Sequence, residues 1–177
     1  MLLLKEVPKY ECLLERSRRY PELDPSAMEA FLHLMRTSTD LTEAFGVLHA
    51  SHNISHGRFI VLMLLNRAPE KPVNPADLAD RADVTRATMT GLIDRLERDG
   101  LVRREPTPDD RRMMLVRLTV KGRRYFERIL PDYFRRVATV MRRLTQAERR
   151  TLVGLMAKIA EAIPDASAGA PGQRADS

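Results

Sequence analysis

Apolar residues recur at helical spacing along most of the chain, and this pattern predicts a mainly helical protein. The helices expected from it span residues 10–20, 26–50, 57–67, 75–82, 86–99, 119–141 and 145–163. Two short segments, 101–105 and 114–118, are instead typical of strands joined as a hairpin. The segment 57–67 is apolar almost all round, so we expect it at the centre of the core.

Capping residues and prolines indicate where the longer helices begin and end. Ser26–Glu29 and Thr145–Glu148 each have the spacing of a capping box, which places a helix start at Ser26 and at Thr145. Pro25 is expected to break any helix before that first start, and Pro164 to end the last helix. Pro131 lies inside the helix 119–141 and should kink it.

The stretch 75–118 holds two helices, a tight turn at 83–85 and the hairpin. Apolar residues of its second helix fall on one face, and Gly100 ends that helix, while the opposite face is small, polar and basic. Such a second helix enters a DNA major groove, and a basic hairpin tip beside it reaches the minor groove. The residues expected to contact DNA are Thr85, Arg86, Thr88, Thr90 and Arg95 on the helix and Asp110, Arg111 and Arg112 at the tip.

The charge of the chain is concentrated in this half. The 177 residues carry a net charge of +6, and residues 81–143 hold 17 Lys and Arg against 9 Asp and Glu, a net of +8. The excess therefore lies in and just after the stretch expected to bind DNA, as a polyanionic partner requires. A solvated basic helix face is the plainer alternative, and the arginines at the hairpin tip favour DNA binding over it.

The order of these features resembles the MarR-type transcriptional regulators. The resemblance rests on the pattern Thr85–Val102, on Asp110-Arg111-Arg112 in the wing and on the exit Leu118-Thr119-x-x-Gly122, and it covers residues 26–163. It implies a winged helix-turn-helix with a small β-hairpin wing plus a helical dimerisation lobe. The expected parts are an arm and first dimerisation helix (1–54), the DNA-binding lobe (55–118), two dimerisation helices (119–163) and a disordered tail (164–177). A twofold homodimer of this kind would repress by reading a pseudo-palindromic operator in double-stranded DNA.

The resemblance also implies an effector, because the family binds small aromatic acids between its two lobes. Histidines and arginines of the first two helices would hold the carboxylate there, while apolar side chains cover the ring. The candidate ligand-binding residues are His33, Arg36, His49, His52, His56, Arg58, Phe59 and Met63. The N-terminal block is similar to that of regulators of nicotinate breakdown, which suggests nicotinate or 6-hydroxynicotinate; a phenolic carboxylate is the alternative.

Other readings of these residues stay open. His49 and His52 have the spacing of metal ligands, but no convincing set of further ligands accompanies them, so we expect neither a metal nor a cofactor. Cys12 could sense oxidants, although its neighbours do not obviously activate a thiol. A helical adaptor that binds no DNA is a further alternative, whereas no catalytic motif supports an enzyme. The absence of a long apolar run or a signal sequence predicts a cytoplasmic protein.

Overall fold

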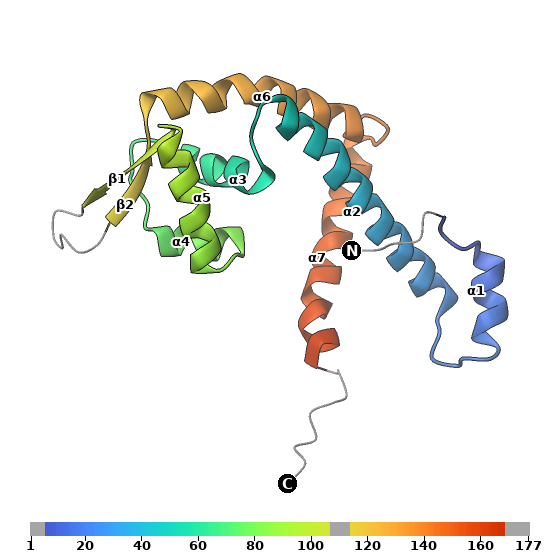
Figure 1. The fold of residues 1–177 in the computed structure, drawn as a ribbon. Helices are drawn as coiled ribbons and strands as arrows, with labels where there is room; N and C mark the ends of the chain where they lie inside the picture. The colour runs from blue at the N-terminus through green and yellow to red at the C-terminus, as the bar shows by residue number, and fades with distance from the viewer. Residues whose placement is uncertain (1–5, 107–113, 169–177) are drawn as a thin grey trace, which may run out of the picture. The chain divides into compact units, whose positions relative to one another are not determined.

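The structure is a computed structural model, and it describes residues 6–106 and 114–168 (Figure 1). The described chain is mainly helical, as predicted, and contains one two-stranded antiparallel sheet. Its elements are α1 (Tyr10–Ser17), α2 (Pro25–Ser51), α3 (His56–Asn66), α4 (Pro75–Ala82), α5 (Arg86–Arg98), β1 (Val102–Pro106), β2 (Met114–Leu118), α6 (Val120–Met141) and α7 (Gln146–Ala168). None of the described helices is both long enough and apolar enough to cross a lipid bilayer.

Contacts divide the chain into two compact units. The first, up to Asp132, holds α1 to α5, the β1–β2 hairpin and the first part of α6; the second holds the rest of α6 and α7. Helix α6 passes through Pro131, one residue before the boundary. Proline has no backbone N–H to donate to the carbonyl of the preceding turn. One hydrogen bond of α6 is therefore missing beside the boundary between the two units. The kink expected there stays a prediction.

The core of the first unit forms around α3, as the apolar sequence of this helix predicts. Phe59, Val61, Leu62 and Leu65 are almost completely buried. Helices α4 and α5, strand β2 and the end of α2 pack against α3. Residues from these neighbours and from α6 complete the core, namely Leu48, Leu78, Met89, Ile93, Leu96, Val116, Phe126 and Ile129. The helix-turn-helix is thus built on one buried helix.

Two predicted helix boundaries are wrong. Helix α2 begins at Pro25, and its cap is Asp24, whose Oδ1 accepts the backbone N–H of Ser26 at 2.8 Å and of Ala27 at 3.1 Å. Proline suits the first helical position because the N–H that it lacks has no partner there. Helix α7 likewise continues through Pro164 to Ala168. The capping box of Thr145 and Glu148 is confirmed, with reciprocal bonds of 2.7 and 3.3 Å.

The exit motif after the hairpin has a steric reason. The Oγ1 of Thr119 accepts the backbone N–H of Gly122 at 2.9 Å and donates to the carbonyl of Gly100 at 2.7 Å. A Cβ on Gly122 would lie 1.9 Å from the carbonyl oxygen of Leu101, so no other residue fits there without movement. Thr119 and Gly122 together fix the start of α6 against the segment that follows α5.

Candidate nucleic-acid interface

The two helices of the helix-turn-helix are joined by a capped, tight turn. The side chain of Asn74 accepts the N–H of Ala76 at 2.8 Å and so caps α4, with Pro75 in its first turn. Asp83 ends α4 in a left-handed conformation with φ of 52°, which short polar side chains tolerate better than most. Thr85 then caps α5 by accepting the N–H of Thr88 at 3.1 Å. The turn predicted at 83–85 is confirmed.

Helix α5 separates its buried and exposed faces sharply. Met89, Ile93 and Leu96 have no measurable exposure. All of the DNA-contacting residues predicted on this helix are exposed, namely Thr85, Arg86, Thr88, Thr90 and Arg95, and Arg98 is exposed with them. The five predicted residues are thus all exposed, on or at the start of a helix that packs against strand β1 of the hairpin (Figure 1).

The threonine hydroxyls on this surface are already engaged. The Oγ1 atoms of Thr85 and Thr88 are 2.9 Å apart, and Thr90 donates its hydroxyl hydrogen to the carbonyl of Arg86 at 2.9 Å. A hydroxyl has one hydrogen and two lone pairs. Thr90 can therefore accept a hydrogen bond from a base amino group or offer its methyl group to thymine, but it cannot donate without breaking its own bond.

Arg104 of β1 pairs with the acidic side chains of α5. Its guanidinium contacts Asp94 at 2.5 Å and also Glu97, and its backbone N–H donates to Glu97 at 2.9 Å. Burial opposes the charge of Arg104, but the hydrogen bonds with the two carboxylates outweigh it, and its pKa is raised. The negative charges of Asp94 and Glu97 on α5 are thus neutralised by Arg104. No described carboxylate pairs with Arg86 or Arg95, so their charge is available to phosphate.

Gly91, near the middle of α5, belongs to the outer face predicted from the sequence but was not among the residues expected to contact DNA. It is exposed, and a Cβ built on it would meet no described atom within 4 Å. Glycine inside a helix costs about 1 kcal/mol of stability relative to alanine. Nothing in the described part of the subunit explains this choice. The sequence signal that could have identified this position was a helix-weakening glycine among the residues expected to contact DNA.

The hairpin beside α5 has a regular register. Val102 pairs with Leu118 and Pro106 with Met114, and a separate bridge joins Val73, between α3 and α4, to Val116. This bridge ties the hairpin to the start of the helix-turn-helix. The predicted contacts Asp110, Arg111 and Arg112 belong to 107–113, which lies outside the described residues.

Some of the candidate ligand-binding residues gather where α2, α3 and α6 meet. The ring of His49 lies 4.9 Å from that of Phe59 and 5.1 Å from that of His56, and Phe59 lies 5.4 Å from Phe126. His49 is 3% exposed, and neither of its ring nitrogens has a hydrogen-bond partner. Burial, followed by the neighbouring His56 and His52, lowers the pKa of His49. Its imidazole is therefore neutral near pH 7, which corrects any expectation that this histidine supplies a positive charge.

A second polar group joins α3 to the end of α5. Arg58 forms an ion pair with Asp99, the residue that ends α5, while the buried Nε of Arg58 has no partner. Tyr125 of α6 donates its hydroxyl to the carbonyl of His52 at 2.5 Å, and burial raises its pKa. The ring of His52 lies 2.9 Å from Asp132. Arg58 thus links α3 to the C-terminus of the helix expected to read DNA, whereas Tyr125 and Asp132 link α6 to His52 at the end of α2.

The remaining candidates lie apart from this group. His33 is exposed and Arg36 pairs with Asp40 at 2.7 Å, both in the first half of α2. At 1.5 Å per helical residue, His33 is roughly 24 Å along the axis from His49, so one subunit does not bring them together. Met63 is half-buried on α3. Within the described ranges, no three His, Cys, Asp or Glu side chains are grouped as a metal site would need.

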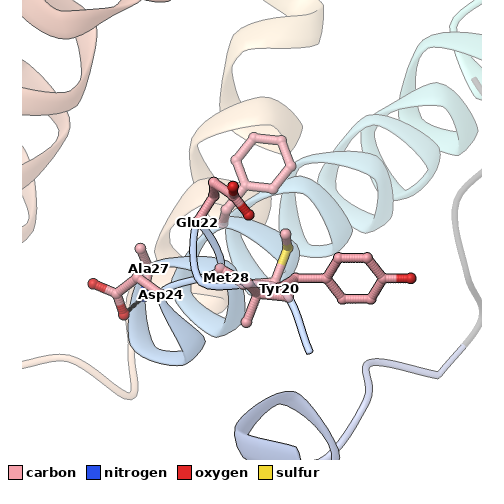
Figure 2. Close-up of a pocket in the computed structure, with 7 residues that line it drawn as sticks. Tyr20, Glu22, Asp24, Ala27 and Met28 are labelled. Atoms are coloured by element: carbon pink, nitrogen blue, oxygen red, sulfur yellow. Dashed lines mark hydrogen bonds between the residues drawn. The ribbon is translucent and has the colours of Figure 1, made fainter. Parts of the chain in front are cut away.

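A separate hollow of about 470 Å³ lies where the chain enters α2 (Figure 2). Tyr20, Met28 and Phe31 contribute apolar surface to it, and Glu22 and Asp24 lie at its edge. Tyr20 and Phe31 are each more than half exposed. Cys12 on α1 is also exposed, as a redox-active thiol would have to be.

Comparisons with known proteins agree on one family. The profile of the MarR family matches residues 52–113. The HTH-type transcriptional repressor YetL of Bacillus subtilis (strain 168) is 34% identical over 158 residues, covering 89% of this chain and 95% of YetL. The homoprotocatechuate degradative operon repressor of Escherichia coli is 34% identical over 77 residues, or 44% of this chain and 51% of that protein.

The crystal structure of Sco3205, a MarR family transcriptional regulator from Streptomyces coelicolor in complex with DNA, is similar to the fold of this chain. Its TM-score is 0.73 at 26% identity, and the match covers 78% of this chain and 88% of Sco3205. Sco3205 is thus a structural neighbour whose crystal structure contains DNA.

Proposed function

This chain belongs to the MarR family of DNA-binding transcriptional regulators, and on that premise we propose that it is a repressor which a small aromatic carboxylate releases from its operator. The chain is therefore a regulator and not an enzyme. The repressor named YetL supports the direction of regulation, because its match spans nearly the whole of both chains.

In the proposed complex, α5 enters a major groove and the hairpin tip with Arg111 and Arg112 reaches the adjacent minor groove. The exposure of Thr88, Thr90 and Arg95 supports the first contact, and the basic tip sequence supports the second. The ion pairs of Arg104 assist, because they keep two carboxylates of α5 from repelling phosphate.

The operator would be read by a homodimer. Helix α7 exposes a row of apolar side chains at helical spacing, and α2 exposes Met28 and Phe31 near the hollow of Figure 2. The exposed apolar residues of α7 are Val153, Leu155, Met156, Ile159 and Ile163. Apolar surfaces of this extent are normally covered by another protein, and a twofold partner would present two α5 helices to successive major grooves.

The observation that carries the effector proposal is the set of buried polar atoms without a hydrogen-bond partner. Among the described residues, only His49 and Arg58 have such side-chain atoms, and both were candidates from the sequence. A buried, unpaired donor or acceptor is costly and is normally satisfied by a ligand or water. An aromatic acid could reach both: its carboxylate would accept from Arg58 and from a ring N–H of His49, while its ring would pack against Phe59. The name of the Escherichia coli relative, a homoprotocatechuate operon repressor, supports an effector of this class.

The arrangement also offers a way to release DNA. Arg58 holds Asp99, which ends α5. A ligand carboxylate that competes for Arg58 would loosen this attachment of the reading helix. Release requires only that the ligand prefer the subunit arrangement that does not bind DNA, by about 1.4 kcal/mol for each tenfold loss of operator affinity.

The test begins with the operator, which is found by sequencing the genomic DNA that the protein retains. Calorimetric titration of nicotinate, 6-hydroxynicotinate and salicylate then measures binding, and fluorescence anisotropy measures operator release. We expect His49→Phe and Arg58→Met to weaken binding of the acid, whereas His33→Ala, a remote exposed control, should not. If no acid binds below millimolar concentration, or binding leaves operator affinity unchanged, the effector proposal fails while DNA binding stands.

A further inference from the structure

Gly91 lacks the structural requirement that explains Gly57, Gly100 and Gly122. A Cβ on Gly122 would collide with Leu101, and one on Gly57 would press on Leu92 at 3.1 Å. Gly100 has a positive φ of 70° at the end of α5. A Cβ on Gly91 would have no described atom within 4 Å. Its φ is not positive, because its backbone is ordinary helix. Packing and backbone geometry within residues 6–106 and 114–168 therefore do not require a glycine at this position.

Gly91 lies on the side of α5 that faces away from the core. At about 100° per residue, it lies roughly 160° around the helix from both Met89 and Ile93, which are fully buried. Thr88 and Arg95 are its neighbours three residues before and four residues after on the same face, and both are exposed. Gly91 thus sits at the centre of the surface proposed to enter the major groove.

We propose that Gly91 is a specificity-determining residue, whose missing side chain lets the backbone of α5 approach the base edges of the operator closely. The inference rests on the proposed docking of α5 in the major groove. Glycine is the residue that proteins use where a backbone must lie against a ligand, even though it weakens the helix. The weakened helix is retained because contact with DNA requires the open space.

The consequence for binding follows from distances. A methyl group at Gly91 would add about 1.5 Å at the centre of the contact. Hydrogen bonds from flanking side chains such as Thr88 and Arg95 to base edges need donor–acceptor separations near 3 Å, so they would stretch or break. Electrostatic attraction to phosphates falls off more gently with distance and would remain. The substitution should thus weaken operator binding much more than binding to random DNA.

The experiment compares Gly91→Ala and Gly91→Gln with Gly46→Ala. Gly46 is the matched control, because it lies exposed inside α2 and its Cβ would also meet nothing within 4 Å. Both alanine variants should raise Tm by about 2 to 4 °C, since alanine favours helix. Gly91→Ala should lose at least tenfold in operator affinity and less than twofold on random duplex. Gly91→Gln should lose more, and Gly46→Ala should bind both DNAs as the wild type does.

A parallel variant, Arg95→Ala, separates this inference from the docking that it rests on. If Arg95→Ala weakens operator binding while both Gly91 variants bind normally, α5 reads DNA but Gly91 does not set the approach, and the inference is overturned. If all three bind as the wild type does, the proposed docking of α5 fails as well. If Gly91→Ala lowered affinity equally for operator and for random DNA, the inference about Gly91 would also be overturned, because specificity would then be unaffected.

Discussion

At the scale of single residues, Arg104 is the side chain on which the charge of the DNA-reading surface depends. It holds Asp94 and Glu97 of α5 and is itself 25% exposed. We expect Arg104→Gln to lower the free energy of unfolding by about 1 to 2 kcal/mol, allowing for the partial exposure of both carboxylates. Operator affinity should fall by about tenfold, because two uncompensated carboxylates would then face phosphate. Chemical denaturation and anisotropy titration measure the two effects.

The control for Arg104 is its neighbour Arg103, which points to the other face of the strand and is 60% exposed. Arg103→Gln removes the same charge but leaves Asp94 and Glu97 paired. Adding Glu97→Gln to the Arg104→Gln variant should recover part of the lost affinity. Equal effects of the Arg103 and Arg104 substitutions would show that only net charge matters.

His49 gives the fold a dependence on pH. Burial and the nearby histidines lower its pKa below the ordinary value of 6.5, so the folded protein takes up a proton on His49 less readily than the unfolded chain. Stability from this residue is therefore complete above about pH 6.5 and is lost as the pH falls below it. We expect His49→Phe, which keeps an aromatic ring beside Phe59, to lose less stability than the wild type between pH 7.5 and 5. Urea denaturation at both pH values measures the difference; identical pH dependence would contradict the prediction.

At the scale of elements, the start of α6 is the join on which the hairpin and α5 depend. We expect Gly122→Ala to lower the free energy of unfolding by at least about 2 kcal/mol, because its Cβ would overlap the carbonyl of Leu101. Thermal and urea denaturation measure the loss. Gly46→Ala is the comparison, since it adds the same methyl group in open space and should stabilise the protein. A Gly122→Ala protein as stable as the wild type would mean that α6 can shift at little cost.

The recognition helix is attached at its middle and at its C-terminal end by contacts from other elements. Arg104 of β1 holds its middle, while Arg58 of α3 pairs with Asp99 and Lys121 of α6 donates to the Asp99 carbonyl at 2.6 Å. A rigid attachment places the reading side chains reproducibly, and an attachment made of ion pairs can be exchanged with a charged ligand. The element that binds DNA is thus also the one that a carboxylate can influence.

At the scale of the whole molecule, the apolar row of α7 should make the protein an obligate dimer. Leu155 and Ile159 are 51% and 43% exposed in the single chain. We expect Leu155→Asp with Ile159→Asp to abolish dimerisation and to lower operator affinity by more than tenfold, because only one half-site could then be bound at a time. Light scattering at micromolar concentration measures the first effect. The charge swap Lys158→Glu with Glu161→Lys is the control, and a folded wild-type monomer would contradict the proposal.

The sequence by itself determined most of the elements and the family. Helical periodicity, the caps of Thr85 and Thr145, and the Thr119–Gly122 bond of the exit motif are local signals, since each can be read within one helix or at its start. Where two local signals competed, the helix start predicted from the sequence was wrong. Ser26 offered a capping box, yet Asp24 followed by Pro25 provides the cap in the structure.

Only the tertiary structure decided the electrostatics and the grouping of the candidate site. Arg104 meets Asp94 from ten residues away, and His52 meets Asp132 from eighty, so neither pair is visible in spacing along the chain. The neutral state of His49 follows from its burial, which depends on how α2 packs on its neighbours rather than on its own sequence. Charge pairing and desolvation are set by distances in space, and those exist only once the helices have packed.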